Sequence, residues 1–377
     1  MNKLYEKHRL LFLVPSLQGG GAERVVITLL RHLSPERFDL TLAVVDGSRA
    51  AYLADLPAHV KYVDLQSRRV RYSLHKILRL VWTRRPEVIF STLGHLNLSL
   101  ALIKPLLPGR TRLVARETAV VSEMLRAQTG GGLWSLAYKR LSDRFDMVIC
   151  QSYSMQDELV SLFGYHVDKT VVIRNPIEID RIKRLADEPL PASVLRKWRK
   201  NGDEIILVAA GRLSHEKGFD LLIEAIAILS NPRFRLVILG DGPLREDLER
   251  LAVAYQIADQ VEFVGFVGNP YRYFARASAV ILSSRTDAFP NVVLEALACG
   301  SPVIATPASG GVREILDGRR GCLICEEISA ESLASGIANY RFDSAGARDA
   351  SDISEFSAEQ ITTEYAAILS GLVSSRT

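Results

Sequence analysis

Short apolar runs alternate with amphipathic segments along the whole chain. The runs are continuous rather than alternating between apolar and polar residues, as expected for strands of a parallel sheet that is buried on both faces. In the first half the predicted strands are 10–14, 40–45, 62–65, 88–91, 112–115, 147–150 and 170–173. In the second half they are 205–210, 235–239, 261–264, 279–283, 302–305 and 321–324.

Segments with helical periodicity separate these runs. One apolar stripe at helical spacing consists of Val26, Leu29, Leu30 and Leu33. Strands that alternate with helices predict βαβ units, which build doubly wound parallel sheets. The alternation breaks at Asn175 and Pro176, where proline restricts the preceding residue to extended conformations. We therefore predict an α/β protein with two doubly wound, Rossmann-like domains, residues 1–175 and 176–356, facing each other across a cleft.

The composition is that of an ordinary two-domain globular protein, with 377 residues, 48% hydrophobic and 24% charged. The N-terminus has too few apolar residues before Pro15 for a secretory signal, and no apolar run is long enough to span a bilayer. The four cysteines suit a reducing compartment. We expect a cytoplasmic protein.

Charge is distributed unevenly along the chain. Residues 1–180 carry 25 Lys and Arg against 17 Asp and Glu, whereas residues 181–377 carry 22 against 26. A basic half suggests an acidic partner such as phosphate groups, nucleic acid or an anionic membrane, although a merely uneven surface explains the excess equally well. Aromatic and basic residues do not interleave, so we expect no nucleic acid partner.

Two cations follow the predicted strand 205–210. Arg212 and Lys217 flank a turn that opens the next helix. A planar guanidinium and a movable ammonium suit a diphosphate group. The alternative is a solvated charged loop, which the position at the carboxyl end of a strand disfavours.

Glycine turns follow other strands. Gly20 and Gly21 follow the first strand and open a helix, where free backbone N–H groups can face an anion. Gly242 lies in a tight turn after 235–239. Each turn taken singly is also compatible with a flexible connection.

Two carboxylates follow the strand 279–283. Asp287 lies among turn-forming residues, and Glu295 lies about one turn into a helix predicted over 289–299, with Gly300 as its stop. A carboxylate near a helix N-terminus is stabilised as an anion and can accept hydrogen bonds from sugar hydroxyls. Helix capping without a ligand is the alternative.

These motifs together resemble the retaining glycosyltransferases of family 4, which have the GT-B fold and are also called glycosyl transferases group 1. The resemblance rests on "GRLSHEKGFD", "LGDGP", "FVGFV" and "DAFPNVVLEALACGSPVIAT" within 205–312, and on "GGGAER" near the N-terminus. It covers nearly the whole chain. It also implies that a final helix, within residues 357–377, packs back across the two domains.

The resemblance implies a role for each matching residue. Arg212 and Lys217 would hold the diphosphate of a nucleotide-sugar donor, with Gly20 and Gly21 approaching from the other domain. The donor would also contact Gly242, Phe266, Val267, Asp287, Phe289, Pro290, Asn291 and Glu295. The family usually has Glu and Gly where this chain has Asp287 and Ala288. The carboxylate of Asp287 is therefore one methylene closer to the backbone than the usual glutamate.

Residues after two other strands of the first half are further candidates. His95 follows the strand 88–91 and could orient the donor or assist proton transfer, or be a structural loop histidine. Arg116 and Glu117 follow the strand 112–115 and could contact the acceptor, or form a surface ion pair. We count Arg212, Lys217, Asp287 and His95 as the catalytic candidates.

Metal chemistry is not indicated by the sequence. It has no Asp-x-Asp motif and no His/Cys cluster at metal spacing, and Cys322 and Cys325 lie in and directly after the predicted strand 321–324. We therefore expect no metal and no cofactor, with a nucleotide-diphosphate sugar as donor substrate. Cations beside the leaving diphosphate would stabilise the charge that grows as the glycosidic bond breaks.

Two segments suggest a membrane. Residues 68–85 combine an apolar stripe with many cations, and residues 129–141 place glycines before Leu133, Trp134, Leu136 and Tyr138. For the stripe of 68–85, packing on the sheet is favoured, although its clustered cations could still attract lipids. Because many members of the family extend lipid-linked saccharides, the resemblance implies peripheral association with the inner face of the cell membrane.

The resemblance therefore implies a retaining glycosyltransferase. It would move a hexose or N-acetylhexosamine from a UDP- or GDP-sugar to a saccharide or polyprenyl-linked acceptor in cell-surface glycan assembly. A non-transferring enzyme of the epimerase type and a non-catalytic nucleotide-sugar-binding protein remain alternatives on the same fold.

Overall fold

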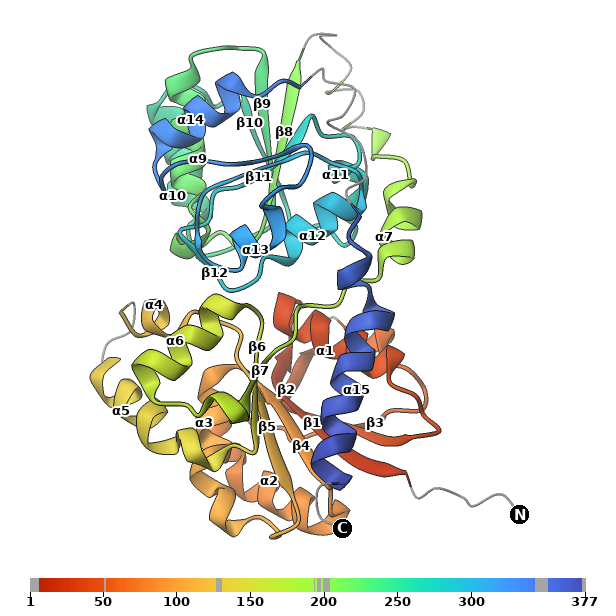
Figure 1. The fold of residues 1–377 in the computed structure, drawn as a ribbon. Coiled ribbons are helices and arrows are strands. Elements are labelled where there is room, and N and C mark those ends of the chain that lie inside the picture. Colours follow the sequence, from red (N-terminus) through yellow and green to blue (C-terminus); the bar gives the residue numbers. More distant parts are fainter. Residues whose placement is uncertain are drawn as a thin grey trace. The chain divides into compact units, whose positions relative to one another are not determined.

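The computed structural model describes residues 7–50, 52–126, 131–192, 194, 198, 204–342 and 352–374. The chain divides into two compact units, shown in Figure 1. Unit 1 comprises Met1–Ile177 together with Phe356–Thr377, and unit 2 comprises Glu178–Glu355. The segment after residue 355 therefore returns to unit 1.

Unit 1 contains a seven-stranded parallel sheet of order β3-β2-β1-β4-β5-β6-β7. The strands are β1 (His8–Leu17), β2 (Phe38–Ala50), β3 (Lys61–Asp64), β4 (Val88–Thr92), β5 (Arg112–Arg116), β6 (Met147–Cys150) and β7 (Thr170–Val172). The helices are α1 (Gly21–His32), α2 (Val70–Arg84), α3 (Gly94–Ile103), α4 (Val121–Arg126), α5 (Gly131–Leu141), α6 (Tyr153–Phe163) and α15 (Ala358–Ser374).

Unit 2 contains a six-stranded parallel sheet of order β10-β9-β8-β11-β13-β15 and a small two-stranded sheet, β12-β14. Its strands are β8 (Ile205–Ala210), β9 (Phe234–Leu239), β10 (Val261–Gly265), β11 (Ala279–Leu282), β12 (Thr286–Asp287), β13 (Val303–Ala305), β14 (Ser309–Gly310) and β15 (Cys322–Ile324). Its helices are α7 (Ile179–Ala186), α9 (Phe219–Leu229), α10 (Arg245–Ala254), α11 (Tyr271–Phe274), α12 (Asn291–Ala298), α13 (Val312–Leu316) and α14 (Ala330–Asn339).

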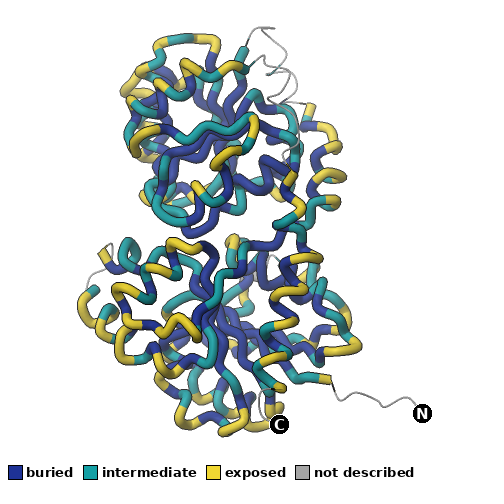
Figure 2. Tube along the Cα trace, viewed as in Figure 1, coloured by how far each residue is buried: buried dark blue, intermediate teal, exposed yellow. Residues whose placement is uncertain are grey.

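The strand predictions are confirmed, because every predicted run overlaps an observed strand. The largest difference is at β2, which continues to Ala50. The prediction missed β12 and β14, since strands of two residues carry no periodic apolar signal. The strands could be predicted because the central strands of each unit are buried on both faces and are therefore continuous apolar runs. Figure 2 shows them as dark, buried stretches of the tube.

Each sheet has one switch point, where the chain leaves one side of the starting strand and continues on the other. In unit 1 the switch lies between β1 and β4, and in unit 2 between β8 and β11. Ligands of doubly wound sheets bind outside the carboxyl ends of the strands at such a point. The loops after these four strands are therefore where a site is expected.

Helix α15 completes the core of unit 1. Ile361, Tyr365 and Leu369 are buried in the same cluster as β1 and β4 residues, and the Tyr365 ring lies edge-on to Phe90 at 5.9 Å. The hydrogen bond from Ala358 N to Ile177 O joins the start of this helix to the end of the first segment of unit 1.

Candidate functional site

The switch point of unit 2 brings together two predicted residues that are seventy positions apart in sequence. Lys217 ends the 3₁₀ turn His215–Lys217 after β8, and Asp287 lies in β12 after β11. The Lys217 ammonium donates to the Asp287 carboxylate at 2.5 Å. Burial alone would lower the pKa of Lys217, but the charge of Asp287 and the hydrogen bond outweigh it and raise that pKa. Lys217 is therefore held in place as a cation.

The β11 loop also clamps the backbone of the loop that carries Lys217. The Ser283 hydroxyl donates to Lys217 O at 2.9 Å, and the Arg285 guanidinium donates to His215 O. Arg285 also forms a two-pronged ion pair with Asp220 of α9, and these hydrogen bonds raise the pKa of Arg285. Sequence reasoning missed Ser283, Arg285 and Asp220, although all three lie inside or beside the quoted motifs.

Arg212 lies at the surface at the start of the same loop. Among the described residues its guanidinium has no hydrogen-bond or ion-pair partner. The structure thus brings Lys217 and Asp287 together and leaves Arg212 exposed, which suits a side chain that binds an anionic ligand from solvent.

Glycines let the neighbouring loops of unit 2 pack closely. A Cβ on Gly242 would lie 2.5 Å from Leu213 O, and one on Gly240 would lie 1.9 Å from Gly211 O. Gly242 thus supports the loop that carries Arg212 and Lys217. Phe266 is 71% exposed directly after β10, and Val267 is half-buried.

The second half of the site surrounds Asp287. The strand β12 pairs with β14, so that Asp287 lies opposite Gly310. Gly310 has φ +115°, and a Cβ there would lie 2.1 Å from Asp287 O. Ala288 O accepts from Gly311 N at 2.8 Å. Of the following candidates, Phe289 and Pro290 are buried, Asn291 is half-buried as the first residue of α12, and Glu295 is 6% exposed in the same helix.

The switch point of unit 1 carries the remaining candidates. Gly20 and Gly21 are exposed at the N-terminus of α1, beside the buried Glu23, whose pKa is raised by burial. His95 is exposed in the first turn of α3, after β4. Partial desolvation of its imidazole lowers the pKa of His95, which favours the neutral ring at neutral pH.

Arg116 and Glu117 lie below the surface of unit 1, with 1% and 2% of their area exposed. The alternative of a surface ion pair is therefore wrong, because both side chains are enclosed by protein groups. Arg116 donates to the Asn175 side chain, and Glu117 accepts from Asn97 Nδ2 at 2.9 Å. Burial raises the pKa of Glu117 to about 7. Their contact with an acceptor stays a prediction.

Cysteines and metal-ligand types form no cluster in the part of the chain that the structure describes. Cys322 and Cys325 are free thiols, and burial raises the pKa of each to about 11. No group of three or more His, Cys, Asp or Glu side chains among the described residues is placed to hold a metal ion.

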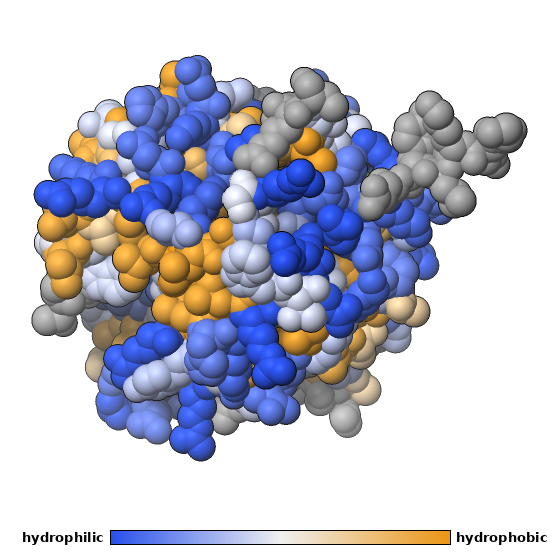
Figure 3. Space-filling view, turned by 90° about the horizontal axis from the view of Figure 1, so that it is seen from below, coloured by the Kyte–Doolittle hydropathy of each residue, from blue (hydrophilic) through white to orange (hydrophobic). Residues whose placement is uncertain are grey.

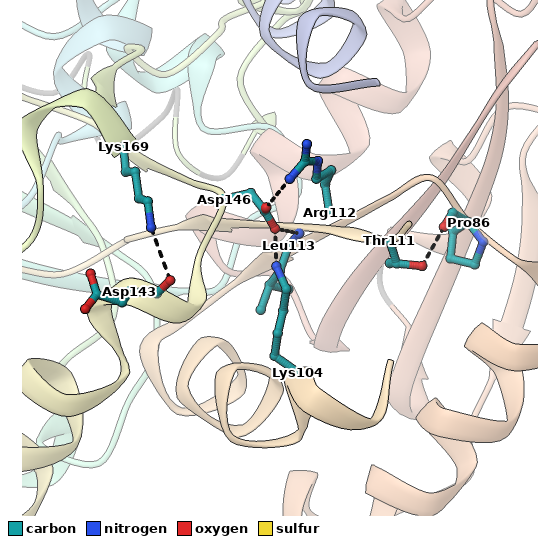
Figure 4. A network of polar contacts seen from close by, with 8 residues as sticks. All are labelled: Pro86, Lys104, Thr111, Arg112, Leu113, Asp143, Asp146 and Lys169. Atoms are coloured by element: carbon teal, nitrogen blue, oxygen red, sulfur yellow. Dashed lines mark hydrogen bonds and ion pairs between the residues drawn. The ribbon is translucent and has the colours of Figure 1, made fainter. Parts of the chain in front are cut away.

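Two features lie away from the switch points. A surface hollow of about 550 Å³ between α10 and β10 is lined by none of the predicted site residues. A polar network surrounds Asp146 at the amino ends of β5 and β6, where its carboxylate accepts from Arg112, Lys104 and Leu113 N (Figure 4). This network lies at the edge opposite the candidate site and is therefore structural.

The two segments that suggested a membrane differ in the structure. Helix α2 buries Val70, Ile77 and Val81, which favours the alternative that its stripe packs inside unit 1. Helix α5 instead exposes Leu133, Trp134 and Leu136, by 75%, 36% and 47%. Figure 3 shows apolar surface bordered by hydrophilic side chains on one face of the molecule. Residues 129 and 130 of the second segment lie outside the described residues.

No helix within the described ranges has the length and apolar character needed to cross a membrane.

The fold defines a class of protein. Two doubly wound parallel sheets, each with one switch point, are the architecture of the GT-B fold. Residues 19–181 match the family described as Glycosyltransferase Family 4, and residues 193–352 match Glycosyl transferases group 1. The chain belongs to this glycosyltransferase family and is a glycosyltransferase enzyme.

Individual relatives are similar over most of their length. The chain is 28% identical over 342 residues to the N-acetylgalactosamine-N,N'-diacetylbacillosaminyl-diphospho-undecaprenol 4-alpha-N-acetylgalactosaminyltransferase of Campylobacter jejuni, covering 85% of this chain and 87% of that protein. It is 28% identical over 340 residues to the phosphatidylinositol N-acetylglucosaminyltransferase gpi3 subunit of Schizosaccharomyces pombe, covering 86% and 71%.

Solved structures share the fold. Anabaena HepE in complex with UDP-glucose superposes with a TM-score of 0.78 at 21% identity, covering 96% of this chain and 99% of that one. The sucrose-phosphate synthase of Thermosynechococcus elongatus superposes with a TM-score of 0.81 at 18% identity, covering 97% and 99%. The GT-B fold predicted from the sequence is confirmed by this likeness.

Proposed function

We propose that this enzyme transfers a hexose or N-acetylhexosamine from a nucleotide-diphosphate sugar to a saccharide or lipid-linked saccharide, with retention of anomeric configuration, in cell-surface glycan assembly. The observation that carries the proposal is the clamped Lys217–Asp287 pair at the switch point of unit 2, with Arg212 exposed on the same loop.

The proposed chemistry follows from where charge develops. The bond between the anomeric carbon and the diphosphate oxygen breaks, and the leaving group gains negative charge. Lys217, which is held by Asp287, and Arg212, which is exposed on the same loop, stabilise that charge from beside the diphosphate. The acceptor hydroxyl oxygen forms the new bond on the same face of the sugar, and its proton passes to the leaving phosphate oxygen. The reaction thus needs no protein nucleophile.

The donor and acceptor classes are supported by relatives. A structural neighbour binds UDP-glucose, and the two relatives described above are named for acceptors with diphospho-undecaprenol and phosphatidylinositol. We assign this chain a UDP- or GDP-sugar donor and a saccharide or polyprenyl-linked acceptor. Asp287 and Glu295 are assigned to hydroxyl groups of the donor sugar and ribose.

Peripheral membrane association is part of the proposal. The apolar face of α5 lies beside the exposed cations Lys139 and Arg140, and Arg68, Arg69 and Arg71 lie exposed at the start of α2. Apolar insertion and attraction to anionic lipid act together in such surfaces. We therefore place the enzyme on the cytoplasmic face of the cell membrane, where a lipid-linked acceptor would be within reach.

The donor assignment is tested with a panel of UDP- and GDP-sugars. A donor that binds the native state raises the unfolding temperature, and the donor so found is then assayed for transfer to a polyprenyl-diphosphate saccharide. Proton NMR of the product reports the anomeric configuration. Conversion of donor without acceptor would support an epimerase instead, and donor binding without any transfer would support a non-catalytic binding protein.

Two variants test the site itself. Lys217→Ala and Arg212→Ala should each lower kcat by about 10²–10³-fold, as removal of a charge-stabilising donor does elsewhere. The unfolding temperature should change little in Arg212→Ala, whereas Lys217→Ala also breaks the ion pair with Asp287 and should lower it modestly. Lys183→Ala and Arg250→Ala, both exposed in unit 2, are the matched controls. Wild-type turnover in either folded site variant would refute the diphosphate assignment.

Membrane association is measured by sedimentation with anionic vesicles. The double variant Leu133→Asp/Leu136→Asp should lose binding, whereas Leu162→Asp, which is 54% exposed on α6, should keep it. Absence of wild-type binding at low salt would remove membrane association from the proposal.

A further inference from the structure

The turn that carries His95 is strained. Leu93 has φ 76° and ψ 123°, although it is not a glycine. It joins the end of β4 to Gly94 and His95, the first two residues of α3. Such a backbone conformation is uncommon for a residue other than glycine and persists only where the surroundings enforce it. The groups packed against this turn are therefore of interest.

A buried polar cluster of Asn97, Glu117 and Tyr138 packs against this turn. Asn97 is 0% exposed, and its side chain accepts from Ser91 Oγ at 2.8 Å and donates to Arg116 O at 3.1 Å. It also donates to Glu117 Oε1. One amide thus ties the end of β4, the first turn of α3 and the end of β5 together.

The other oxygen of Glu117 faces helix α5. Tyr138 of that helix is 0% exposed, and its hydroxyl donates to Glu117 Oε2 at 3.5 Å. A Cβ added to Gly94 would lie 2.0 Å from the same hydroxyl oxygen. The Tyr138 hydroxyl therefore lies against the Gly94 backbone, one residue before His95.

We propose that Tyr138, Glu117 and Asn97 are positioning residues that hold the strained Leu93–His95 turn and thereby orient the His95 imidazole. The inference rests on the proposed function, in which His95 orients the donor sugar or assists proton transfer. It also gives α5 two roles. Its outer face exposes Leu133, Trp134 and Leu136, and its inner face fixes the turn through Tyr138.

The cluster makes the turn sensitive to pH. Burial raises the pKa of Glu117 to about 7, while its hydrogen bonds from Asn97 and Tyr138 act in the opposite direction. The other titratable groups that face it are Arg116, Cys150, Glu158 and Tyr165. Burial raises the pKa of Cys150 and Tyr165, so both stay neutral at neutral pH. Glu117 is then the member of this cluster that changes charge near pH 7.

The test compares Tyr138→Phe and Glu117→Gln with wild type. Tyr138→Phe removes only the hydroxyl and keeps the ring contact with Phe163. Tyr153→Phe, 58% exposed on α6, and Glu123→Gln, in an exposed ion pair on α4, are the matched controls. The measurements are kcat and donor KM from pH 5.5 to 9 and the NMR signal of the His95 imidazole, assigned with His95→Gln.

Tyr138→Phe should lower kcat about tenfold or more with donor KM nearly unchanged, since a misplacement of about 1 Å can cost 10²-fold. The His95 signal should shift in both variants, and its inflection near pH 7 should vanish in Glu117→Gln. Unchanged His95 signals and pH profiles would overturn the inference, even if the unfolding temperature falls. Because the NMR signal needs no turnover, failure of the proposed function and failure of this inference are distinguishable.

Gly94→Ala provides an independent route to the same turn. The backbone of Gly94 lies outside the left-handed region, so the added methyl group is opposed by side chains of the cluster, first by the Tyr138 hydroxyl at 2.0 Å and then by Tyr138 Cζ at 3.3 Å and Glu117 Oε2 at 3.5 Å. Gly94→Ala should shift the His95 signal and lower kcat. Gly132→Ala on α5 should change neither, because a Cβ added there would have no atom within 4 Å. A Gly94→Ala variant with wild-type kcat and His95 signal would also overturn the inference.

Discussion

At the scale of single residues, the burial and charge of the Lys217–Asp287 pair determine at which pH it stabilises the fold. Lys217 and Asp287 are partly buried, with 28% and 11% of their side chains exposed, and neither charge is well solvated. Because folding raises the pKa of Lys217, the stability that its charge contributes on the alkaline side is complete up to the ordinary lysine pKa of about 10.4 and is lost only as pH rises through the raised value. The cation is thus available throughout the neutral range.

Asp287→Asn should separate the positioning of Lys217 from its charge. The variant keeps the shape but removes the carboxylate, so unit 2 should lose about 1–2 kcal/mol and kcat should fall about tenfold or more. Asp287→Glu keeps the charge and should mainly change donor KM, since it restores the longer acid typical of the family. Thermal unfolding and steady-state kinetics measure both effects. Asp247→Asn, exposed on α10, is the control, and wild-type kcat in Asp287→Asn would contradict this assignment.

Asp146 offers a pH-dependent prediction away from the site. Burial would raise the pKa of Asp146, but hydrogen bonds from Lys104, Leu113 N and Arg112 outweigh it and lower that pKa. Burial lowers the pKa of Lys104 more than Asp146 raises it, so the stabilisation is assigned to the carboxylate with its several donors. A lowered acid pKa stabilises the fold above its ordinary value of about 4, and this is lost as pH falls through the lowered value.

Asp146→Asn should therefore destabilise unit 1 by about 1–2 kcal/mol at pH 7. The difference from wild type should shrink as pH falls below about 4. Denaturant unfolding at pH 7 and at low pH measures it. Asp143→Asn, with a carboxylate that is 71% exposed, is the control. A difference that stays constant down to pH 3 would refute this account.

At the scale of elements, the short ladder β12–β14 decides where Asp287 lies. Two residues pair with two others, and Gly310 is required both by its φ of +115° and by its approach to Asp287 O. The ladder joins the loop after β11 to the loop after β13. It acts as a local brace for the acid rather than as part of the core sheet.

Gly310→Ala should displace Asp287 without unfolding unit 2. The added methyl group meets the Asp287 carbonyl and forces a conformation that costs about 1–3 kcal/mol. We expect weaker donor binding by calorimetry and a lower kcat, with the native far-UV spectrum retained. Gly109→Ala, which has no atom within 4 Å and no positive φ, should leave both unchanged. Undiminished donor binding in Gly310→Ala would show that the brace is not needed.

At the scale of the whole molecule, the chain crosses from unit 1 to unit 2 and returns. Helix α15 follows unit 2 in sequence but belongs to the core of unit 1. The His32 imidazole lies 3.6 Å from the Glu359 carboxylate, and Arg37 donates to the Ser370 hydroxyl. Unit 1 is therefore incomplete until α15 is in place.

Leu369→Ala tests this dependence. The side chain is 0% exposed in the unit 1 core, so its truncation should destabilise unit 1 by about 2–5 kcal/mol. Leu162→Ala, 54% exposed on α6, should change stability by about 0.5 kcal/mol or less. Hydrogen exchange resolved by peptide separates the two units, since one unfolding transition need not describe both. Faster exchange confined to unit 2 would contradict the assignment of α15 to unit 1.

The sequence by itself determined the strands of the two large sheets and the segments after these strands that carry Arg212, Lys217 and Asp287. These follow from local apolar periodicity and from the rule that ligands bind at the carboxyl ends of parallel strands. It also placed Glu295 in the helix that the structure shows.

The tertiary structure alone decided which side chains meet. The pairing of Lys217 with Asp287, the ion pair of Arg285 with Asp220, and the packing of Glu117 against Gly94 join residues of different structural elements. Such contacts depend on strand order and helix packing, which the apolar periodicity along the chain does not predict. The return of α15 to unit 1 has the same cause, because an apolar helical stripe specifies that a face is buried but not what buries it.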